Sequence, residues 1–386
     1  TFKDGTTKEV TIPLKVKDVT PPTIQAPTEN TNWEMTALDK TLPNMEVRAE
    51  DNANGSGVKT VSVEGLPDYL EYDSTTNSIK FKTGKQEVEK LPENTPSKEF
   101  NLNIRVEDNA GNISERTAKI TVSSMSAKTN PQPIDQMVNY GQVPNPEDSV
   151  NKQGLPDGTT VTWKTPPVVN TPGSTTGEVE ITYPDGSKDA VNVTVNVRKL
   201  SDEYEPTGDK IVKNQNATVT NDDLKAAVTI SNNGASKVKS VTPIGTIITT
   251  NTGTQMISAT VTYLDNTTDT VTIPLEVKDV TPPTIQTPAN GQNIDLIALD
   301  KAFSPIKVTS NDNAGGSGVQ STTVTDLPDF LTYDDATKTI KFKEGTQEVP
   351  KLPVGTDSQT YTTTIRVTDN ANNSSTSHLT FIVKSM

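Results

Sequence analysis

The sequence of 386 residues contains no cysteine and a single histidine, His378. Without thiols the chain forms neither disulfide bonds nor thiolate metal sites. A single histidine leaves almost no candidates for a Ser-His-Asp catalytic triad or a Cys-His catalytic pair. Paired carboxylates can hydrolyse glycosides, but the two tryptophans, Trp33 and Trp163, lie far apart in the sequence and suggest no sugar-binding platform. We therefore expect no enzymatic activity, with His378 exposed on the surface.

Hydrophobic residues are also scarce, at 31% of the chain, and aromatic residues make up 4%. No apolar run approaches the roughly 20 residues that a membrane-spanning helix needs, and no secretion signal begins at Thr1. We expect no membrane insertion in this chain and expect it to be an internal part of a longer protein. So few apolar residues suit several small domains with thin cores better than one large core.

Positive charge is in deficit, because 35 Lys and Arg residues face 49 Asp and Glu residues and leave a net charge of −14. An acidic chain repels phosphate, which argues against nucleic acid as a partner. Carboxylates suit a solvated surface, and they are also ligands that calcium prefers.

The feature that is present in abundance is repetition. The sequence TIPLKVKDVTPPTIQAP begins at Thr11, and TIPLEVKDVTPPTIQTP begins at Thr272, an offset of 261 residues (272 − 11). The match then continues without a gap, so that Met125 corresponds to Met386. A gapless match of this length indicates a tandem duplication.

A weaker repeat lies inside the first one. Tyr183-Pro184-Asp185-Gly186 precedes a valine-rich strand, and Tyr263-Leu264-Asp265-Asn266 precedes another at an offset of 80 (263 − 183). Phe2-Lys3-Asp4-Gly5 opens the chain in the same way. We therefore divide the chain into a terminal hairpin of a preceding domain (residues 1–17), a first large domain (18–125), a first small domain (126–198), a second small domain (199–278) and a second large domain (279–386).

Local patterns predict β-structure throughout. Residues 191–197 alternate valine with polar residues, which gives a strand one apolar and one polar face. Asp185-Gly186 and Asp4-Gly5 lie between such runs and predict hairpins. A short helical turn is predicted over 221–227, with Asn221 as its N-cap. The predicted fold class is all-β, a tandem array of small immunoglobulin-like β-sandwich domains that forms an elongated rod.

Two sequence families resemble these segments. The stretches GLPDGTTVTWK from Gly154 and VEITYPDGSKDAVNVTVNV from Val179 resemble Rib domains, the stalk repeats of Rib/alpha-like surface proteins of Gram-positive bacteria. The second small domain resembles a divergent Rib domain, because its Tyr263 motif lacks the proline and the glycine. The large domains resemble cadherin-like, immunoglobulin-like adhesin modules through DVTPPTI (18–24), LPDYLEYDSTTNSIKF (66–81) and DNAGN (108–112).

These resemblances imply a surface location and a site for a cation. Acidic residues recur at three places in both large domains: at the junction with the preceding domain, in the middle of the domain and before the last strand. Loops at one end of a sandwich cluster in space, and related cadherin-like modules bind calcium at such positions. The predicted ligands are Asp18, Glu50, Asp51, Asn52, Asp108 and Asn109 in the first large domain, and Asp279, Asp312, Asn313, Asp369 and Asn370 in the second.

The alternative for these residues is that Asp-Asn-Ala-Gly only forms turns through hydrogen bonds from backbone to side chain. If calcium does bind, we expect the second site to be weaker, because Asn311 stands where the first copy has Glu50.

Trp33 is either an exposed contact residue or a packing residue that Ile294 replaces in the second copy, and we favour packing. Trp163 is expected to be buried. Lysine–asparagine isopeptide bonds are not expected, because strand lysines such as Lys80 and Lys82 occupy polar positions.

Two function classes remain open. The first is the stalk of an extracellular adhesin, anchored to the cell wall through regions outside this chain, which projects a binding head and is stiffened by calcium at its junctions. The second is an adhesive module that itself contacts a host surface or self-associates in a biofilm, for which an exposed aromatic patch is the expected mark. We expect the chain to be a monomer.

Overall fold

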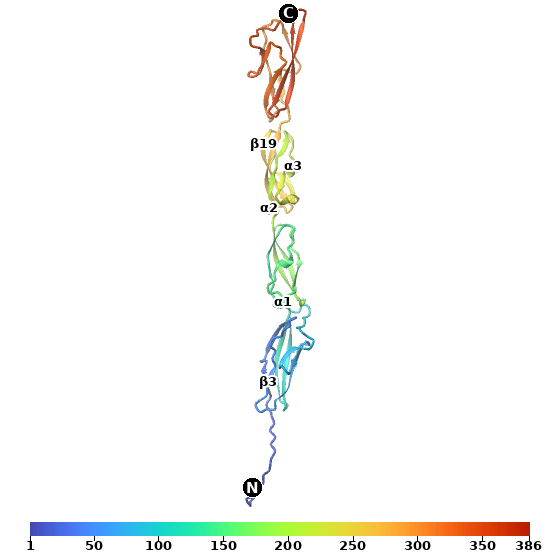
Figure 1. Ribbon diagram of the computed structural model, residues 1–386, viewed down its shortest axis with the longest axis vertical. Coiled ribbons are helices and arrows are strands. Elements are labelled where there is room, and N and C mark those ends of the chain that lie inside the picture. The colour runs from blue at the N-terminus through green and yellow to red at the C-terminus, as the bar shows by residue number, and fades with distance from the viewer. The chain divides into compact units, whose positions relative to one another are not determined.

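The computed structural model describes residues 1–386, and the chain divides into two compact units, Thr1–Arg198 and Lys199–Met386. Each unit contains one large and one small domain, and nearly every regular element is a strand (Figure 1).

The first unit contains the first large and first small domains. The elements of the large domain are β1 Thr23–Ala26, β2 Thr31–Thr36, β3 Arg48–Glu50, β4 Val58–Glu64, β5 Leu70–Asp73, β6 Ser78–Phe81, β7 Ser97–Asp108 and β8 Ile113–Ser123. Those of the small domain are α1 Met125–Lys128, β9 Gln132–Pro133, β10 Gln136–Val138, the 3₁₀ turn η1 Pro146–Asp148, β11 Val150–Asn151, β12 Thr160–Thr165, β13 Gly173–Thr182 and β14 Lys188–Val197.

The second unit contains the second small and second large domains. The elements of the small domain are α2 Leu200–Glu203, β15 Pro206–Gly208, β16 Ile211–Asn214, α3 Asn221–Ala226, β17 Val228–Ile230, the 3₁₀ segment η2 Ser231–Lys237, β18 Val238–Pro243, β19 Gly253–Tyr263 and β20 Thr268–Lys278. Those of the large domain are β21 Thr284–Thr287, β22 Gln292–Ile297, β23 Ile306–Lys307, β24 Thr309–Asn311, β25 Val319–Thr325, β26 Leu331–Asp334, β27 Thr339–Phe342, β28 Ser358–Asp369 and β29 Ser374–Lys384.

All four domains share one sheet design. Each has a four-stranded sheet in which an early strand lies parallel to the last strand, and the last hairpin of the domain occupies the centre. The orders are β2-β8-β7-β4, β10-β14-β13-β12, β16-β20-β19-β18 and β22-β29-β28-β25. Shorter ladders cover the other side, such as β1-β3 and β5-β6 in the first large domain and β9-β11 in the first small domain. Buried residues from both layers form a core in both large domains and in the first small domain. In the second small domain the central strands bury Ile257, Val261, Ile273 and Leu275. The predicted array of β-sandwiches is confirmed.

The alternation in the sequence sets which face of each strand is buried. In β14, Val193, Val195 and Val197 are buried, and the polar residues between them point outward. The same holds for β20, where Ile273, Leu275 and Val277 are buried. Period-two patterning therefore predicts these strands correctly.

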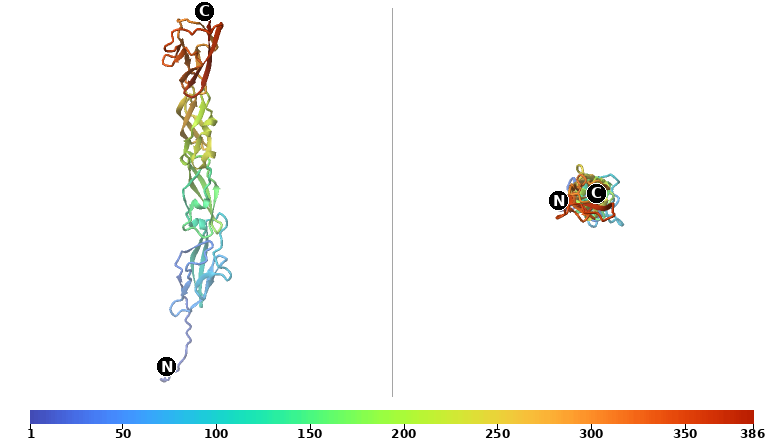
Figure 2. Two further views of the ribbon diagram at one scale, coloured as in Figure 1. Left: turned by 45° about the horizontal axis from the view of Figure 1, so that its top comes forward. Right: turned by 90° about the horizontal axis from the view of Figure 1, so that it is seen from above.

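Residues 1–17 contain the predicted turn but no β-pairing (Figure 1, and from a second direction in Figure 2). The Asp4 carboxylate accepts hydrogen bonds from the backbone N–H and hydroxyl of Thr6, as expected for the start of a hairpin. Val10, Ile12, Leu14 and Val16, which match the buried face of β20, are exposed. The assignment of this segment to a preceding domain stays a prediction.

The predicted helical turn exists as α3, but its predicted cap was wrong. Thr220 is the N-cap: its hydroxyl accepts from the backbone N–H of Asp223, whose carboxylate accepts from the N–H of Thr220 in return. This capping box stabilises the start of the helix. The helical turns α1 and α2 were not predicted, because these single turns depend on contacts with a distant loop rather than on local periodicity.

That distant loop is the Tyr-Pro-Asp-Gly turn. Asp185 is buried; its Oδ1 accepts from the N–H and hydroxyl of Ser187, and its Oδ2 accepts from the N–H of Met125 at 2.7 Å. Burial raises the pKa of Asp185, but the hydrogen bonds from Ser187 and Met125 outweigh it and hold the pKa below its usual value. The second small domain repeats the arrangement, with Asp265 accepting from the N–H of Leu200.

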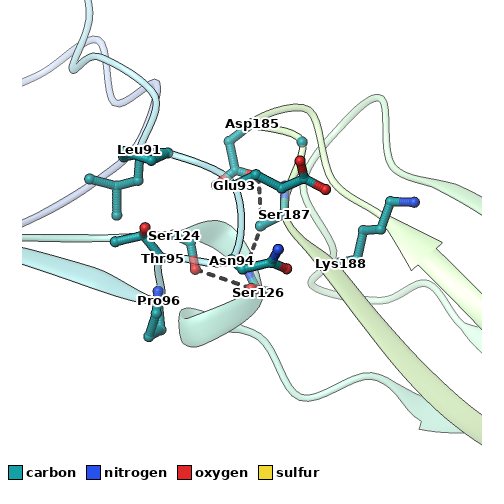
Figure 3. A pocket seen from close by; sticks show the side chains of 12 residues that line it. Leu91, Glu93, Asn94, Thr95, Pro96, Ser124, Ser126, Asp185, Ser187 and Lys188 are labelled. Atoms are coloured by element: carbon teal, nitrogen blue, oxygen red, sulfur yellow. Dashed lines mark hydrogen bonds between the residues drawn. The ribbon is translucent and has the colours of Figure 1, made fainter.

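The same turn also touches the preceding large domain. The Lys90 ammonium donates to the carbonyl of Pro184 at 2.7 Å. Figure 3 shows side chains of Ser124, Ser126, Asp185 and Ser187 around a cavity of about 480 Å³ at this junction. The hydroxyls of Ser124 and Ser126 lie 3.1 Å apart, and the N–H of Ser126 donates to the Ser187 hydroxyl. The signature turn therefore fixes the start of its own domain and the linker before it.

We expect Asp185→Asn to destabilise the first small domain by about 1.5–3 kcal/mol, because an amide cannot satisfy all three donors and a hydrogen bond to a charged group is lost. The amides of Met125 and Ser126 should then exchange faster, as measured by hydrogen exchange and denaturant unfolding. Asp4→Asn is the matched control, since Asp4 forms the same turn without a linker N–H. Equal effects of the two substitutions would contradict this role.

Candidate functional site

Three carboxylates converge in each large domain. The ligand atoms of Asp18, Asp51 and Asp108 all lie within 4.8 Å of one another, and those of Asp279, Asp312 and Asp369 do the same in the second copy. We call these clusters the first and second aspartate triads. Each triad draws one residue from the linker, one from the loop after a short edge strand, β3 or β24, and one from the end of a long central strand, β7 or β28.

Backbone N–H groups hold the carboxylates of the first triad in place. Asp18 accepts from the N–H groups of Thr20 and Ser56, at 3.1 and 2.8 Å. Asp51 accepts from the N–H groups of Asn52 and Gly57. The linker residue Asp18 is thereby attached to the same loop that carries Asp51.

Asp108 is the most enclosed member of the first triad, with no exposed surface. It accepts from the N–H groups of Ala110 and Asn112 and from the Asn112 side-chain amide, at 2.9, 2.8 and 2.7 Å. These contacts build the turn that the Asp-Asn-Ala-Gly sequence predicts.

The second triad repeats these contacts atom for atom. Asp279 accepts from the N–H groups of Thr281 and Ser317, Asp312 from those of Asn313 and Gly318, and Asp369 from those of Ala371 and Asn373 and from the Asn373 amide. The duplication has therefore preserved the whole arrangement and not only the three carboxylates.

Sequence reasoning missed two contributors to each cluster. The side-chain amide of Asn112 donates to the Asp108 carboxylate and to the carbonyl of Asp18, at 2.7 and 3.4 Å, so it joins two members of the triad. Ser56 supplies an N–H to Asp18 and a hydroxyl to the N–H of Ala110. Asn112 is the last residue of the DNAGN motif, and its recurrence as Asn373 in the second copy is the sequence feature from which its role could have been predicted.

Five predicted ligands lie outside the triads. Glu50 accepts from the Gln25 amide and pairs with Arg48 instead. The amide nitrogens of Asn109 and Asn370 donate to loop carbonyls. Asn52 is exposed, and Asn313 faces Gln215 of the second small domain. Because Glu50 is not in the cluster, its replacement by Asn311 gives no reason to expect a weaker second site.

The triads concentrate negative charge without a compensating cation. No lysine or arginine forms an ion pair with any of the six aspartates. Hydrogen bonds from the backbone of Ser56 and Thr20 lower the pKa of Asp18. Burial raises the pKa of Asp108 and Asp279, but hydrogen bonds, chiefly from Asn112 and Ser317, outweigh it and lower the pKa in both. These three groups are therefore ionised at neutral pH.

The residues present fit a hard cation. Calcium is bound by carboxylate and carbonyl oxygens, and a carboxylate has about four lone-pair sites, of which each triad member uses two or three. The loop approaches the carboxylates closely: a Cβ on Gly55 would lie 2.5 Å from the Asp51 Oδ2 atom. The hydrogen bonds satisfy the turn interpretation as well, so both alternatives remain compatible with this geometry.

The other candidate residues have structural surroundings. Trp33 is 7% exposed and lies in the core of the first large domain. Trp163 is half-buried, packs over Gly177 and donates from its indole N–H to the carbonyl of Pro144. His378 is exposed on β29, with the hydroxyl of Thr364 3.5 Å from its ring. Lys80 forms a surface ion pair with Asp73.

The loss of Trp33 in the second copy is compensated across the sheet. Trp33 lies opposite Ile120 in the β2–β8 pair, and Ile294 lies opposite Phe381 in the β22–β29 pair. The large and small residues have exchanged strands, and both Ile120 and Phe381 are fully buried. A close-packed core tolerates such a change when total volume is kept. Trp33 is thus a packing residue, as favoured from the sequence.

We expect Trp33→Ile alone to cost about 2–4 kcal/mol through the cavity it leaves, and Ile120→Phe alone about 1–3 kcal/mol through overpacking. The double variant should cost clearly less than the sum of the two. A double-mutant cycle by denaturant unfolding measures this coupling, and additive costs would contradict the exchange.

Comparison with known sequences agrees with this architecture. Residues 126–199 and 201–279 match the Rib domain family, and residues 21–124 match a bacterial immunoglobulin-like domain family. The C protein alpha-antigen of Streptococcus agalactiae serotype Ia is 26% identical over 342 residues, which cover 83% of this chain and 33% of that protein. The chain therefore spans about a third of the length of this curated relative.

Solved structures give weaker likenesses. A Rib domain from Streptococcus pyogenes is 36% identical and covers 19% of this chain and 95% of its own, with a TM-score of 0.18. Drosophila N-cadherin is 10% identical and covers 92% of this chain and 98% of its own, with a TM-score of 0.30. Scores this low do not define a fold, which rests here on the sheets described above.

The fold and the matched domains define a tandem repeat protein built from immunoglobulin-like and Rib domains. The second large domain belongs with the first through the gapless repeat and the shared strand order. Two of its domains are Rib domains, and the chain as a whole is similar to the Rib/alpha-like repeat surface proteins of Gram-positive bacteria. None of its helices combines the length and apolarity needed to span a membrane.

Proposed function

We propose that this chain is a non-enzymatic spacer of a cell-wall-anchored adhesin, which holds a binding head, outside this chain, away from the cell. The observation that carries the proposal is the duplication of whole domains together with their junction contacts. Repeating a spacer domain lengthens the protein and requires no new binding site. The burial of Trp33 removes the exposed aromatic residue that would have favoured an adhesive module.

Stiffness at the junctions supports a spacer. Thr20-Pro21-Pro22 and Thr281-Pro282-Pro283 follow the linker aspartates, and proline restricts the backbone there. The linker carboxylates of Asp18 and Asp279 are attached by hydrogen bonds to the loops of the large domains. Each linker is thus held to the domain it leads into.

We further propose that each aspartate triad binds one calcium ion. Asp18, Asp51 and Asp108 would hold the first ion, and Asp279, Asp312 and Asp369 the second. A bound divalent cation would offset the uncompensated charge and bridge the linker to two loops of the domain. Calcium would then add to the stiffness of both junctions.

We expect two calcium ions per chain by native mass spectrometry and calorimetry. Asp108→Asn and Asp369→Asn should each remove one ion, and the double variant should bind none. At a calcium concentration one hundred times Kd, the free energy of unfolding should rise by about 2.7 kcal/mol for a single site. Asp4→Asn, which lies outside both triads, is the control. An unmodified chain that binds no calcium would overturn the ion proposal and leave the turn interpretation.

A further inference from the structure

The second large domain is joined to the domain before it by a direct polar contact beside the second triad. Gln215 follows β16 at the end of the second small domain and is 8% exposed. Its side-chain nitrogen donates to the carbonyl of Thr250 in its own domain and to the carbonyl of Ala314 in the large domain, at 2.7 and 2.9 Å. Its side-chain oxygen lies 2.5 Å from the Asn313 amide.

A backbone contact completes this junction. The N–H of Thr252 donates to the carbonyl of Gly315 at 2.9 Å. Gly315 has a φ of 74°, and a Cβ there would lie 2.4 Å from the carbonyl oxygen of Thr250 and 2.7 Å from the Asn251 side-chain oxygen. Any side chain at position 315 would force the two domains apart, because the nearer of these atoms belongs to the backbone.

The first large domain does not have this glycine. Its matching loop is Asp51–Gly57, and Asn54 stands where the second copy has Gly315, again with a positive φ of 63°. Asn52, Ala53 and Asn54 are all exposed. The two loops carry the same triad contacts, so the difference concerns the surface that faces a preceding domain and not the triad.

The first small domain also lacks the partner residue. The N–H of Gly141 donates to Val169 as the N–H of Asn216 donates to Thr249, which places Tyr140 at the position of Gln215. Tyr140 packs against the core of its own domain instead. The first small domain precedes another small domain, whereas the second precedes a large one. Gln215 and Gly315 thus occur together at the one junction of this kind within the chain.

We propose that loop Asp312–Gly318 is a docking surface for the end of a Rib domain that carries Gln215 and Thr250–Thr252, and that Gly315 is the residue that permits this docking. The loop Asp51–Gly57 excludes the same docking because of the Asn54 side chain. The two large domains therefore differ in how firmly they hold a preceding Rib domain. The docking proposal rests on the proposed spacer function, because the docking would set the stiffness of one junction. The docking itself needs no calcium.

The test compares Gly315→Asn with Gly291→Asn in the full chain in the presence of chelator. Gly315 matches Asn54 and Gly291 matches Asn30, so both substitutions introduce the asparagine of the first copy at a position with positive φ. The two positions differ in space, because a Cβ on Gly291 meets nothing within 4 Å. Gln215→Ala is the third variant and removes the contact from the other side. Spin labels on Lys225→Cys and Glu344→Cys report the distance between the two domains, because the chain has no cysteine of its own.

We expect Gly315→Asn and Gln215→Ala to broaden the distance distribution and to lower the hydrogen-exchange protection of the Thr252 amide by about tenfold, the scale of one lost hydrogen bond. Gly291→Asn should leave both readouts as in the parent chain. If Gly315→Asn leaves the distribution narrow, or if Gly291→Asn broadens it equally, the docking role of Gly315 is overturned. Because the chelator removes calcium, the result does not depend on whether the aspartate triads bind calcium.

Discussion

Aspartate carboxylates that accept backbone N–H groups hold every linker of this chain that leads into a described domain. Asp185 and Asp265 bind the first residues of the small domains, and Asp18 and Asp279 tie the linkers to loops of the large domains. Such bonds to ionised acceptors are about twice as strong as those between neutral groups. Because these thin domains have few apolar residues, hydrogen bonds to carboxylates hold the linkers in place of a larger hydrophobic interface.

The duplication shows which features tolerate change. Core residues have exchanged size across a strand pair, as Trp33 and Ile120 became Ile294 and Phe381. The hydrogen bonds that the six triad carboxylates accept are the same in both copies. The loop surface beside the triad has changed, with Gly315 in place of Asn54. Side-chain volume can be redistributed inside a sandwich core. The three carboxylates of a triad cannot be rearranged in the same way, because each one depends on its own backbone N–H donors.

The sequence predicts the fold well because period-two patterning and turn residues are local signals. The strands of the central hairpins and the turns at Asp4 and Asp185 follow from it. The triad aspartates were also predicted, through their recurrence in both copies. Glu50 and Asn109, which adjoin triad members in the sequence, lie outside the clusters, because Glu50 pairs with Arg48 and the Asn109 amide donates to the carbonyls of Ser56 and Gly57. The contacts of Gln215 and Asp185 join positions far apart in sequence and have no local signature.

Small-angle X-ray scattering of the full chain, with calcium and then with chelator, tests the spacer account most directly. A compact chain of this length has a radius of gyration of about 21 Å, and four domains end to end give a value on the order of 40 Å. The account predicts an extended chain whose rigidity decreases when calcium is removed. A compact value would contradict the spacer, and an extended chain unchanged by chelation would contradict calcium stiffening.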